Sequence, residues 1–390
     1  MIRSMSFLLV ATMAGMSLWF MAAAVLPDMA AEGGLSESGL ALLSSAVPAG
    51  FALGALMFAA SGIPDRLDPR YVFAICALTT ALLNAALMIV PIGGLEAVLL
   101  RLATGLAMAG TWPVAMKIAV GWSVDRRGLV MGGLVAAMMF GQAAPFLMAW
   151  IGGADWRFAL LLGSGLAVFG AAAILLTSLG PHHAVAAEFK PAALSLAWTD
   201  YRIRSAILGY LGHMWEFIAF WSWVGVFTSL SYAASMGQSE AISLGKLTAF
   251  FCIFVASPAC LFSGIWADNF GKARVAAIAL AISGLAAVLT ALTFGGPVWL
   301  TFLLVLIWGA AVVPDSPQFS ALVADFAPPE MVGSLLAFQA SLGFLLTAFT
   351  VQMAPIVAEA FGWPILMLIL ALGPVFGLWA IRPALKKEQG

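Results

Sequence analysis

Four ionisable side chains lie within stretches that are otherwise apolar enough to cross a membrane: Arg101, His213, Glu216 and Asp315. A charge at the centre of a bilayer costs at least about 2.5–3.5 kcal/mol, so such residues usually face a polar cavity and carry function. Histidine and carboxylate side chains can take up and release protons, whereas the planar arginine fork matches carboxylates and other oxyanions. These residues predict an intramembrane site that handles protons, an anion or both.

The seventh apolar stretch, 203–230, has polar and aromatic residues at three- and four-residue steps, which would form one stripe of a helix: His213, Glu216, Phe220 and Trp223. His213 and Glu216 would be neighbours there and could share a proton. We expect Glu216 to take part in proton coupling, and Tyr210, His213, Phe220 and Trp223 to contact substrate. The alternative is a polar pair that fixes helix packing, with the aromatic rings in the core or facing lipid.

Asp315 stands between Pro314 and Pro317 in another apolar stretch. Each proline removes a backbone donor and clashes with the preceding turn, so we expect a kinked or broken helix. Such a break is tolerated in a membrane where it lines a cavity. The pattern favours Asp315 as a second proton-coupling residue and the adjacent Gln318 as a substrate contact. The alternative is that Asp315 only caps the kink.

Arg101 lies about two turns into the predicted span 95–119. It could bind an anion or pair with a carboxylate within the membrane. The alternative is a side chain that reaches the headgroups along the bilayer surface. Gln142 in the predicted fifth span is a further polar residue at membrane depth, and we include it among the candidate substrate contacts.

Composition excludes a soluble protein. The chain of 390 residues is 63% hydrophobic and only 9% charged, whereas soluble domains carry about 25% charged residues. The net charge of −1 gives no reason to expect nucleic acid as a partner. The three cysteines form no C-x-x-C pair, and there is no Gly-x-x-x-x-Gly-Lys phosphate loop. We therefore expect no enzyme activity, no cofactor and no metal site.

Runs of about 20 apolar residues are long enough to cross the hydrocarbon core as helices. They predict an all-α membrane protein with twelve transmembrane helices, at 5–27, 40–62, 71–91, 95–119, 128–152, 157–179, 203–230, 243–265, 274–295, 298–323, 332–356 and 361–381. The first run is longer than the apolar core of about 7–15 residues in a signal peptide, so we interpret it as a span.

Lysine and arginine prefer cytoplasmic loops. With the N-terminus in the cytoplasm, fourteen of these residues fall on that side, and only Arg101, Arg157 and Lys246 fall elsewhere. The chain is thus predicted to be a multi-pass protein of the cell inner (cytoplasmic) membrane, with both termini in the cytoplasm.

The longest connection between spans divides the chain into a bundle at 1–180, a cytoplasmic linker at 181–202 and a second bundle at 203–390. Short motifs recur between the halves at an offset of about 200 residues; for example, Pro113 in the fourth span matches Pro314 in the tenth. Parallel halves of this kind are typical of secondary transporters, whose substrate site lies between them near the middle of the membrane.

The loops after the second and eighth spans carry a glycine, an aspartate and basic residues, at Gly62, Asp65, Arg66 and Arg70 and again at Gly264, Asp268, Lys272 and Arg274. With this repeated signature, essentially the whole chain resembles the major facilitator superfamily. The resemblance implies two pseudo-symmetric six-helix bundles, and it assigns Asp65, Arg66, Asp268 and Lys272 to a conformational latch. The alternative is a charged turn that only fixes orientation.

Three stretches, 110–117, 210–216 and 315–320, resemble the branch of bacterial permeases described as nitrate/nitrite-porter- or cyanate-permease-like. Nitrate porters resemble one another by arginines in the second and eighth spans and by Gly-Asn-rich stretches. This chain has neither, which disfavours nitrate as the substrate.

The sequence thus predicts a secondary active transporter that moves a small organic or inorganic anion by alternating access coupled to protons. Its partners would be this small-molecule substrate, protons and the lipid bilayer, and we expect a monomer. One alternative is an exporter of apolar or cationic compounds. Another is a membrane receptor or assembly partner that transports nothing.

Overall fold

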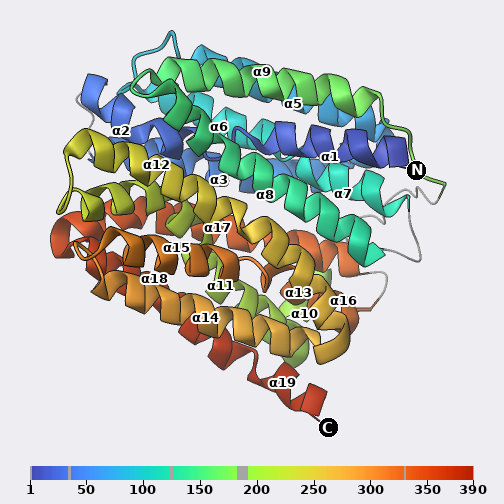
Figure 1. The fold of residues 1–390 in the computed structure, drawn as a ribbon. Helices are drawn as coiled ribbons and strands as arrows, with labels where there is room; N and C mark the ends of the chain where they lie inside the picture. The colour runs from blue at the N-terminus through green and yellow to red at the C-terminus, as the bar shows by residue number, and fades with distance from the viewer. Residues whose placement is uncertain (1, 34–36, 123–126, 182–191, 329–330, 390) are drawn as a thin grey trace.

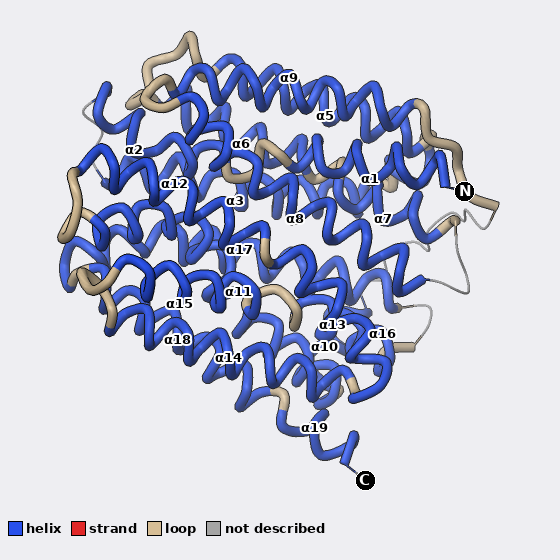
Figure 2. The backbone as a smooth tube through the Cα atoms, viewed as in Figure 1, coloured by secondary structure: helices blue, strands red, loops and turns tan. Residues whose placement is uncertain are grey.

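The computed structural model describes the chain except for residues 1, 34–36, 123–126, 182–191, 329–330 and 390. The described residues form helices joined by short turns and contain no strand (Figure 2). The prediction of an all-α membrane protein is confirmed. Residues 182–191 of the predicted linker at 181–202 lie outside the described residues.

The first half of the chain begins with a span divided in two by a turn at residues 17–20. Its helices are α1 (Ile2–Met16), α2 (Met21–Gly33), α3 (Glu37–Ser61), α4 (Ile63–Arg66), α5 (Pro69–Ala86), α6 (Leu95–Met108), α7 (Trp112–Val120), α8 (Arg127–Gly152) and α9 (Trp156–Leu175).

The second half follows the short helix α10 (Ala192–Thr199) and ends with α19 (Arg382–Gln389). Between them lie α11 (Tyr201–Tyr232), α12 (Gln238–Phe254), α13 (Ala256–Phe270), α14 (Lys272–Leu292), α15 (Val298–Ala311), α16 (Ser316–Phe326), α17 (Val332–Phe361) and α18 (Trp363–Ala380).

Twelve spans result when the helix pairs α1–α2, α6–α7, α12–α13 and α15–α16 each count as one. Ten of the twelve are long and apolar enough, within the described residues, to cross a membrane by length and composition alone. The other two are the first span, whose α1 has only 15 residues, and α11. Polar residues such as His213 and Glu216 lower the mean hydropathy of α11, yet its 32 residues are long enough to span.

The breaks in the fourth and tenth spans follow from their prolines. Helix α15 ends at Ala311 and α16 begins at Ser316, so the predicted break around Pro314 is confirmed. Likewise α6 ends at Met108, and α7 begins at Trp112 with Pro113 in its first turn. A proline is tolerated there because the first N–H groups of a helix have no partner within it.

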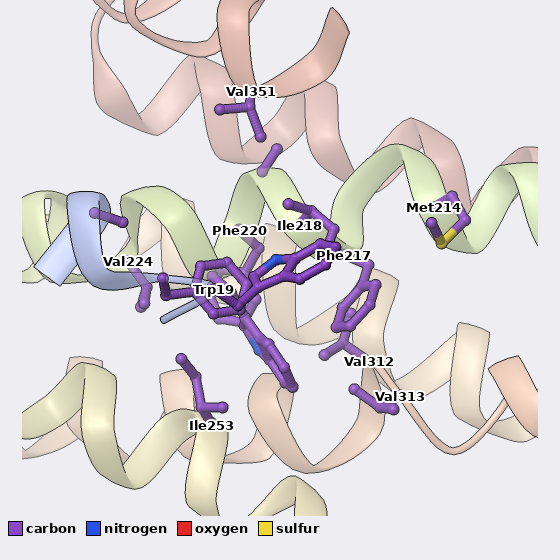
Figure 3. Close-up of a cluster of buried hydrophobic side chains, with 14 of the residues drawn as sticks. Trp19, Met214, Phe217, Ile218, Phe220, Val224, Ile253, Val312, Val313 and Val351 are labelled. Carbon is purple, nitrogen blue, oxygen red and sulfur yellow. The ribbon is translucent and has the colours of Figure 1, made fainter. Parts of the chain in front are cut away.

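Figure 1 shows α1–α9, coloured blue to green, side by side, and α11–α18, coloured yellow to red, packed beside them, with both termini at the same end. Helix α3 packs against α17, and α8 packs against α12 and α13, across the junction of the two halves. Figure 3 shows the buried core at this junction, where Trp19 from the first half lies among Phe217 and Phe220 of α11 and Ile253 of α12.

Candidate functional site

Arg101 faces a narrow crevice at the junction of the halves. The first half contributes Trp19, Phe20, Ser44 and Arg101 with a few small residues, and α11 contributes Ile218 and Ser222; we call this space the Arg101 crevice. In this conformation it is too narrow at any point to admit a water molecule. Arg101 itself is only 1% exposed, so it does not reach a headgroup region.

Arg101 has no carboxylate partner among the described residues. Its Nη1 donates to Asn84 Oδ1 at 3.3 Å. Asn84 in turn donates from Nδ2 to Leu160 O at 3.2 Å and to Ser164 Oγ at 3.0 Å, which ties it to α9. The Nε of Arg101 and the Oγ of Ser44 have no hydrogen-bond partner in the described part of the chain. A buried cation is therefore held in place by a neutral amide and leaves donors free.

His213 and Asp315 form a buried pair across two helices. Nδ1 of His213 lies 2.9 Å from Oδ1 of Asp315, and the two side chains are 0% and 1% exposed. Asp315 directly precedes the first residue of α16, where the helix break places it opposite α11. Despite this short distance, neither ring nitrogen of His213 and neither carboxyl oxygen of Asp315 has a hydrogen-bond partner of good geometry among the described residues. The two groups are thus close enough to exchange a proton after a small reorientation, and both keep atoms free for a water or a ligand.

Glu216 lies one turn further along α11 and is fully buried. Ser283 of α14 donates to its Oε1 at 2.7 Å, and the indole of Trp308 of α15 donates to its Oε2 at 2.9 Å. His213 and Glu216 do not contact each other through a shared proton in this structure, because Glu216 bonds to Ser283 and Trp308 whereas His213 faces Asp315. Glu216 is thus a satisfied carboxyl group inside the second half.

The other predicted substrate contacts are buried in helix packing, three of them on α11, Gln142 on α8 and Gln318 on α16. Phe220 stacks on Trp308 with ring centroids 3.7 Å apart, and Trp223 donates from its indole to Val351 O at 3.1 Å. The Tyr210 ring lies 5.8 Å from that of His213. Gln142 and Gln318 are each 4% exposed. None of these five is among the residues that line the Arg101 crevice.

No ion pair joins two of the predicted latch residues in the described part of the chain. Lys272 pairs with Asp325 at the end of α16, and Asp268 is exposed. Arg66 is also exposed, and the side chain of Asp65 lies outside the described residues. In the first loop Asp68 instead caps α5 and pairs with Arg70 at 2.6 Å. Arg70 also donates to Thr177 O at 3.1 Å, which holds this loop against the end of the sixth span.

A second buried ion pair, which the sequence did not reveal, joins the halves at the end of the molecule opposite the termini. Lys246 of α12 donates to Asp28 Oδ2 of α2 at 2.6 Å and to Gly153 O at 2.7 Å. The two side chains are 6% and 10% exposed. Ser45 of α3 also bonds to Gln352 of α17 across the junction, at 2.9 Å. The sequence shows Lys246 as a lysine inside the predicted span 243–265 but contains no signal for its pairing with Asp28.

Arg157, at the start of α9, forms an exposed pair within the first half. Its Nη2 donates to Glu32 Oε1 at 2.7 Å, and the Trp156 indole donates to Glu32 Oε2 at 2.6 Å. Hydrogen bonds from Arg157, and then from Trp156, lower the pKa of Glu32 to about 2. The carboxylate therefore stays charged throughout the physiological pH range, and the pair closes the end of α2 against α9.

Comparisons with known proteins agree with this architecture. The nucleoside transporter NupG superposes with a TM-score of 0.76 at 15% identity, over 98% of this chain and 99% of that one. A bacterial homologue of the human lysosomal transporter Spinster, solved in an inward-facing and unoccupied conformation, gives 0.74 at 16% identity, over 98% of each chain. At such identities the likeness concerns the fold alone.

No curated protein shows a significant sequence match to this chain. The family model described as "Major Facilitator Superfamily" matches residues 7–261. This match covers more than half of the chain and includes the residues that line the Arg101 crevice, α11 and the first of the two signature loops, whereas the second signature loop follows the matched range. The chain belongs to the Major Facilitator Superfamily of membrane transporters.

Proposed function

We propose that this protein moves a small organic or inorganic anion across the membrane by alternating access, coupled to the movement of protons. It would act as a monomer in the cell inner membrane with both termini in the cytoplasm, an orientation favoured by the distribution of lysine and arginine.

The observation that carries the proposal is that Arg101 is buried without a negatively charged partner among the described residues. An arginine keeps its charge in a protein, and a buried charge is costly unless it is paired. The guanidinium is 1% exposed, yet within the described residues only the amide of Asn84 bonds to it. An anionic substrate would supply the missing charge. Residues of both halves line the crevice, so substrate bound there would contact both when they rock.

Helix α11 connects the proposed anion site with the residues proposed to bind protons. Ile218 and Ser222 line the Arg101 crevice, whereas His213 and Glu216 precede them on the same helix. A shift of α11 on anion binding would change the distance of His213 from Asp315. Proton uptake at the His213–Asp315 pair would then differ between the two orientations of the site, which coupling requires.

Uptake by proteoliposomes under an imposed pH gradient tests the proposal. With the inside alkaline, wild-type vesicles should accumulate anion above equilibrium, and collapsing the gradient with an ionophore should abolish the accumulation. The variant Asp315→Asn should lose accumulation but retain exchange of anion for anion. If flux ignores the gradient in both proteins, proton coupling is wrong.

Export of cationic compounds has less support. The carboxylate that could attract a cation, Glu216, is bonded to Ser283 and Trp308 inside the second half. The charged residue in the crevice between the halves is the cation Arg101.

A further inference from the structure

We propose that the Arg101 crevice selects organic monoanions with one oxyanion group on an apolar body, such as aromatic or branched monocarboxylates. This inference rests on the proposed anion transport and narrows it to a class of substrate. It follows from the number of cations in the crevice, from the donors left free there and from the character of the remaining surface.

The crevice offers a single positive charge. Arg101 is the only charged residue that lines it in the described structure. The other buried cation at the junction, Lys246, is already bonded to Asp28 and to the carbonyl oxygens of Ala149 and Gly153. A dicarboxylate or another dianion would therefore bring a second negative charge into a site of low dielectric without a counter-charge, which is strongly unfavourable.

Two free donors fit one oxyanion group. The Nε of Arg101 and the hydroxyl of Ser44 both line the crevice and have no partner among the described residues. Ser44 is 7% exposed and Arg101 1%, so water does not readily satisfy them. A carboxylate accepts hydrogen bonds at both oxygens and can bind the edge of a guanidinium with two parallel bonds. Free buried donors of this kind are costly until a ligand accepts from them.

Apart from Ser222, the rest of the crevice is lined by apolar side chains whose rings are fixed by neighbouring residues. Trp19 and Phe20 line it from the first half and Ile218 from the second. The Trp19 ring packs 4.9 Å from that of Phe51, and Phe20 packs 5.8 Å from Trp221, so both rings are held in place by neighbours. An apolar body on the anion would bury surface against these side chains when the halves separate enough to admit it. An inorganic anion such as nitrate would leave them unfilled.

The test is inhibition of labelled benzoate exchange in proteoliposomes at equal pH on both sides. Three unlabelled compounds change one property each: terephthalate adds a second carboxylate, formate removes the ring, and benzamide removes the charge. We expect each to inhibit at least tenfold more weakly than benzoate. Proteoliposomes that contain Arg101→Gln are the control for passive permeation of benzoic acid. They should show no benzoate exchange above that passive level.

A binding measurement supports the same test when exchange is slow. Benzoate should raise the melting temperature of the purified wild-type protein in proportion to the logarithm of its concentration, but not that of Arg101→Gln. Ser44→Ala should weaken benzoate binding several-fold, whereas Ser235→Ala, which removes an exposed hydroxyl beyond the end of α11, should leave it unchanged.

Two failures are distinguishable. If formate or terephthalate exchanges or binds as well as benzoate and this depends on Arg101, the selectivity proposed here is wrong while anion transport stands. If no anion of the panel binds or exchanges in an Arg101-dependent way, both proposals fail.

Discussion

Asn84 holds the guanidinium of Arg101 in place without neutralising its charge. It contacts the guanidinium through its oxygen and anchors itself to α9 through its amide nitrogen, so Arg101 is oriented without being neutralised. A carboxylate in that place would form a buried ion pair and compete with any anionic substrate. In the proposed anion site, the neutral amide of Asn84 would therefore act as a positioning group.

We predict that Asn84→Asp raises the KM for anion uptake at least tenfold, because the new carboxylate pairs with Arg101 in the free transporter. A tenfold change corresponds to about 1.4 kcal/mol. Asn84→Ser, which introduces no charge, should raise KM less. Initial rates of uptake at varied substrate concentration, on matched amounts of folded protein, measure this. Equal KM values for the aspartate variant and the wild type would contradict the role given to Arg101.

The sequence identified the ionisable residues of the candidate site but not the residues that they contact. Arg101, His213, Glu216 and Asp315 stood out because charges are rare in apolar spans. The spacing of His213 and Glu216 predicted that they lie on one stripe of α11, yet their partners come from α14, α15 and the break before α16. Helical periodicity places residues on a face and says nothing about which helix that face meets.

The helices pack closely where glycines remove side chains from the contact. A Cβ on Gly105 of α6 would lie 2.0 Å from Val47 O of α3, and one on Gly50 of α3 would lie 1.9 Å from Leu102 O of α6. The two backbones therefore approach within a distance that only glycine allows, as is usual where small residues mediate helix contacts in membranes. Arg101 lies on α6 one turn before Gly105. The close contact of α3 with α6 therefore fixes the position of Arg101 along the helix axis relative to Ser44 on α3.

We predict that Gly105→Ala lowers the melting temperature of the purified protein, because α3 and α6 must separate. Overpacking of this kind costs about 1–3 kcal/mol. The matched control is Gly165→Ala on α9, where a Cβ meets nothing within 4 Å and no loss is expected. Both are measured by thermal unfolding in the same detergent. An unchanged melting temperature for Gly105→Ala would contradict the close contact of α3 with α6.

The elements themselves were largely predictable, because bilayer thickness sets the length of a span and proline marks where a helix breaks. The division of the first span at residues 17–20 was not predicted, since no proline or polar cluster marks it. That turn matters for the site, because it places Trp19 and Phe20 at the Arg101 crevice.

Three basic residues, Arg101, Arg157 and Lys246, lie outside the predicted cytoplasmic loops. Each of them has a specific contact or position in the folded molecule. Arg101 lines the crevice, Arg157 pairs with Glu32, and Lys246 pairs with Asp28. Charge statistics identified them as exceptions, but only the packed structure shows what each contacts. The Lys246–Asp28 pair is the one that joins the two halves, at the end where Ser45 also bonds to Gln352.

We predict that the Lys246–Asp28 pair holds this end closed. Lys246→Met would leave Asp28 unpaired where it is now buried, and loss of one partner of such a pair costs about 3–5 kcal/mol unless the halves separate and admit water. A cysteine at Ser44, in a protein whose three native cysteines are replaced, should then react faster with a membrane-impermeant thiol reagent from that side. The double variant Asp28→Asn with Lys246→Met, which leaves no unpaired charge, should react more slowly than Lys246→Met alone. Equal rates in all three proteins would show that the pair does not hold the halves together.

The central claim is that Arg101 binds an anion that crosses the membrane together with a proton. Adding benzoate to lightly buffered proteoliposomes while recording external pH and benzoate uptake measures both at once. We expect uptake and a rise in external pH together in the wild type, and neither above the level of empty vesicles in Arg101→Gln. Benzoate uptake that is equal in wild type and Arg101→Gln would contradict the account.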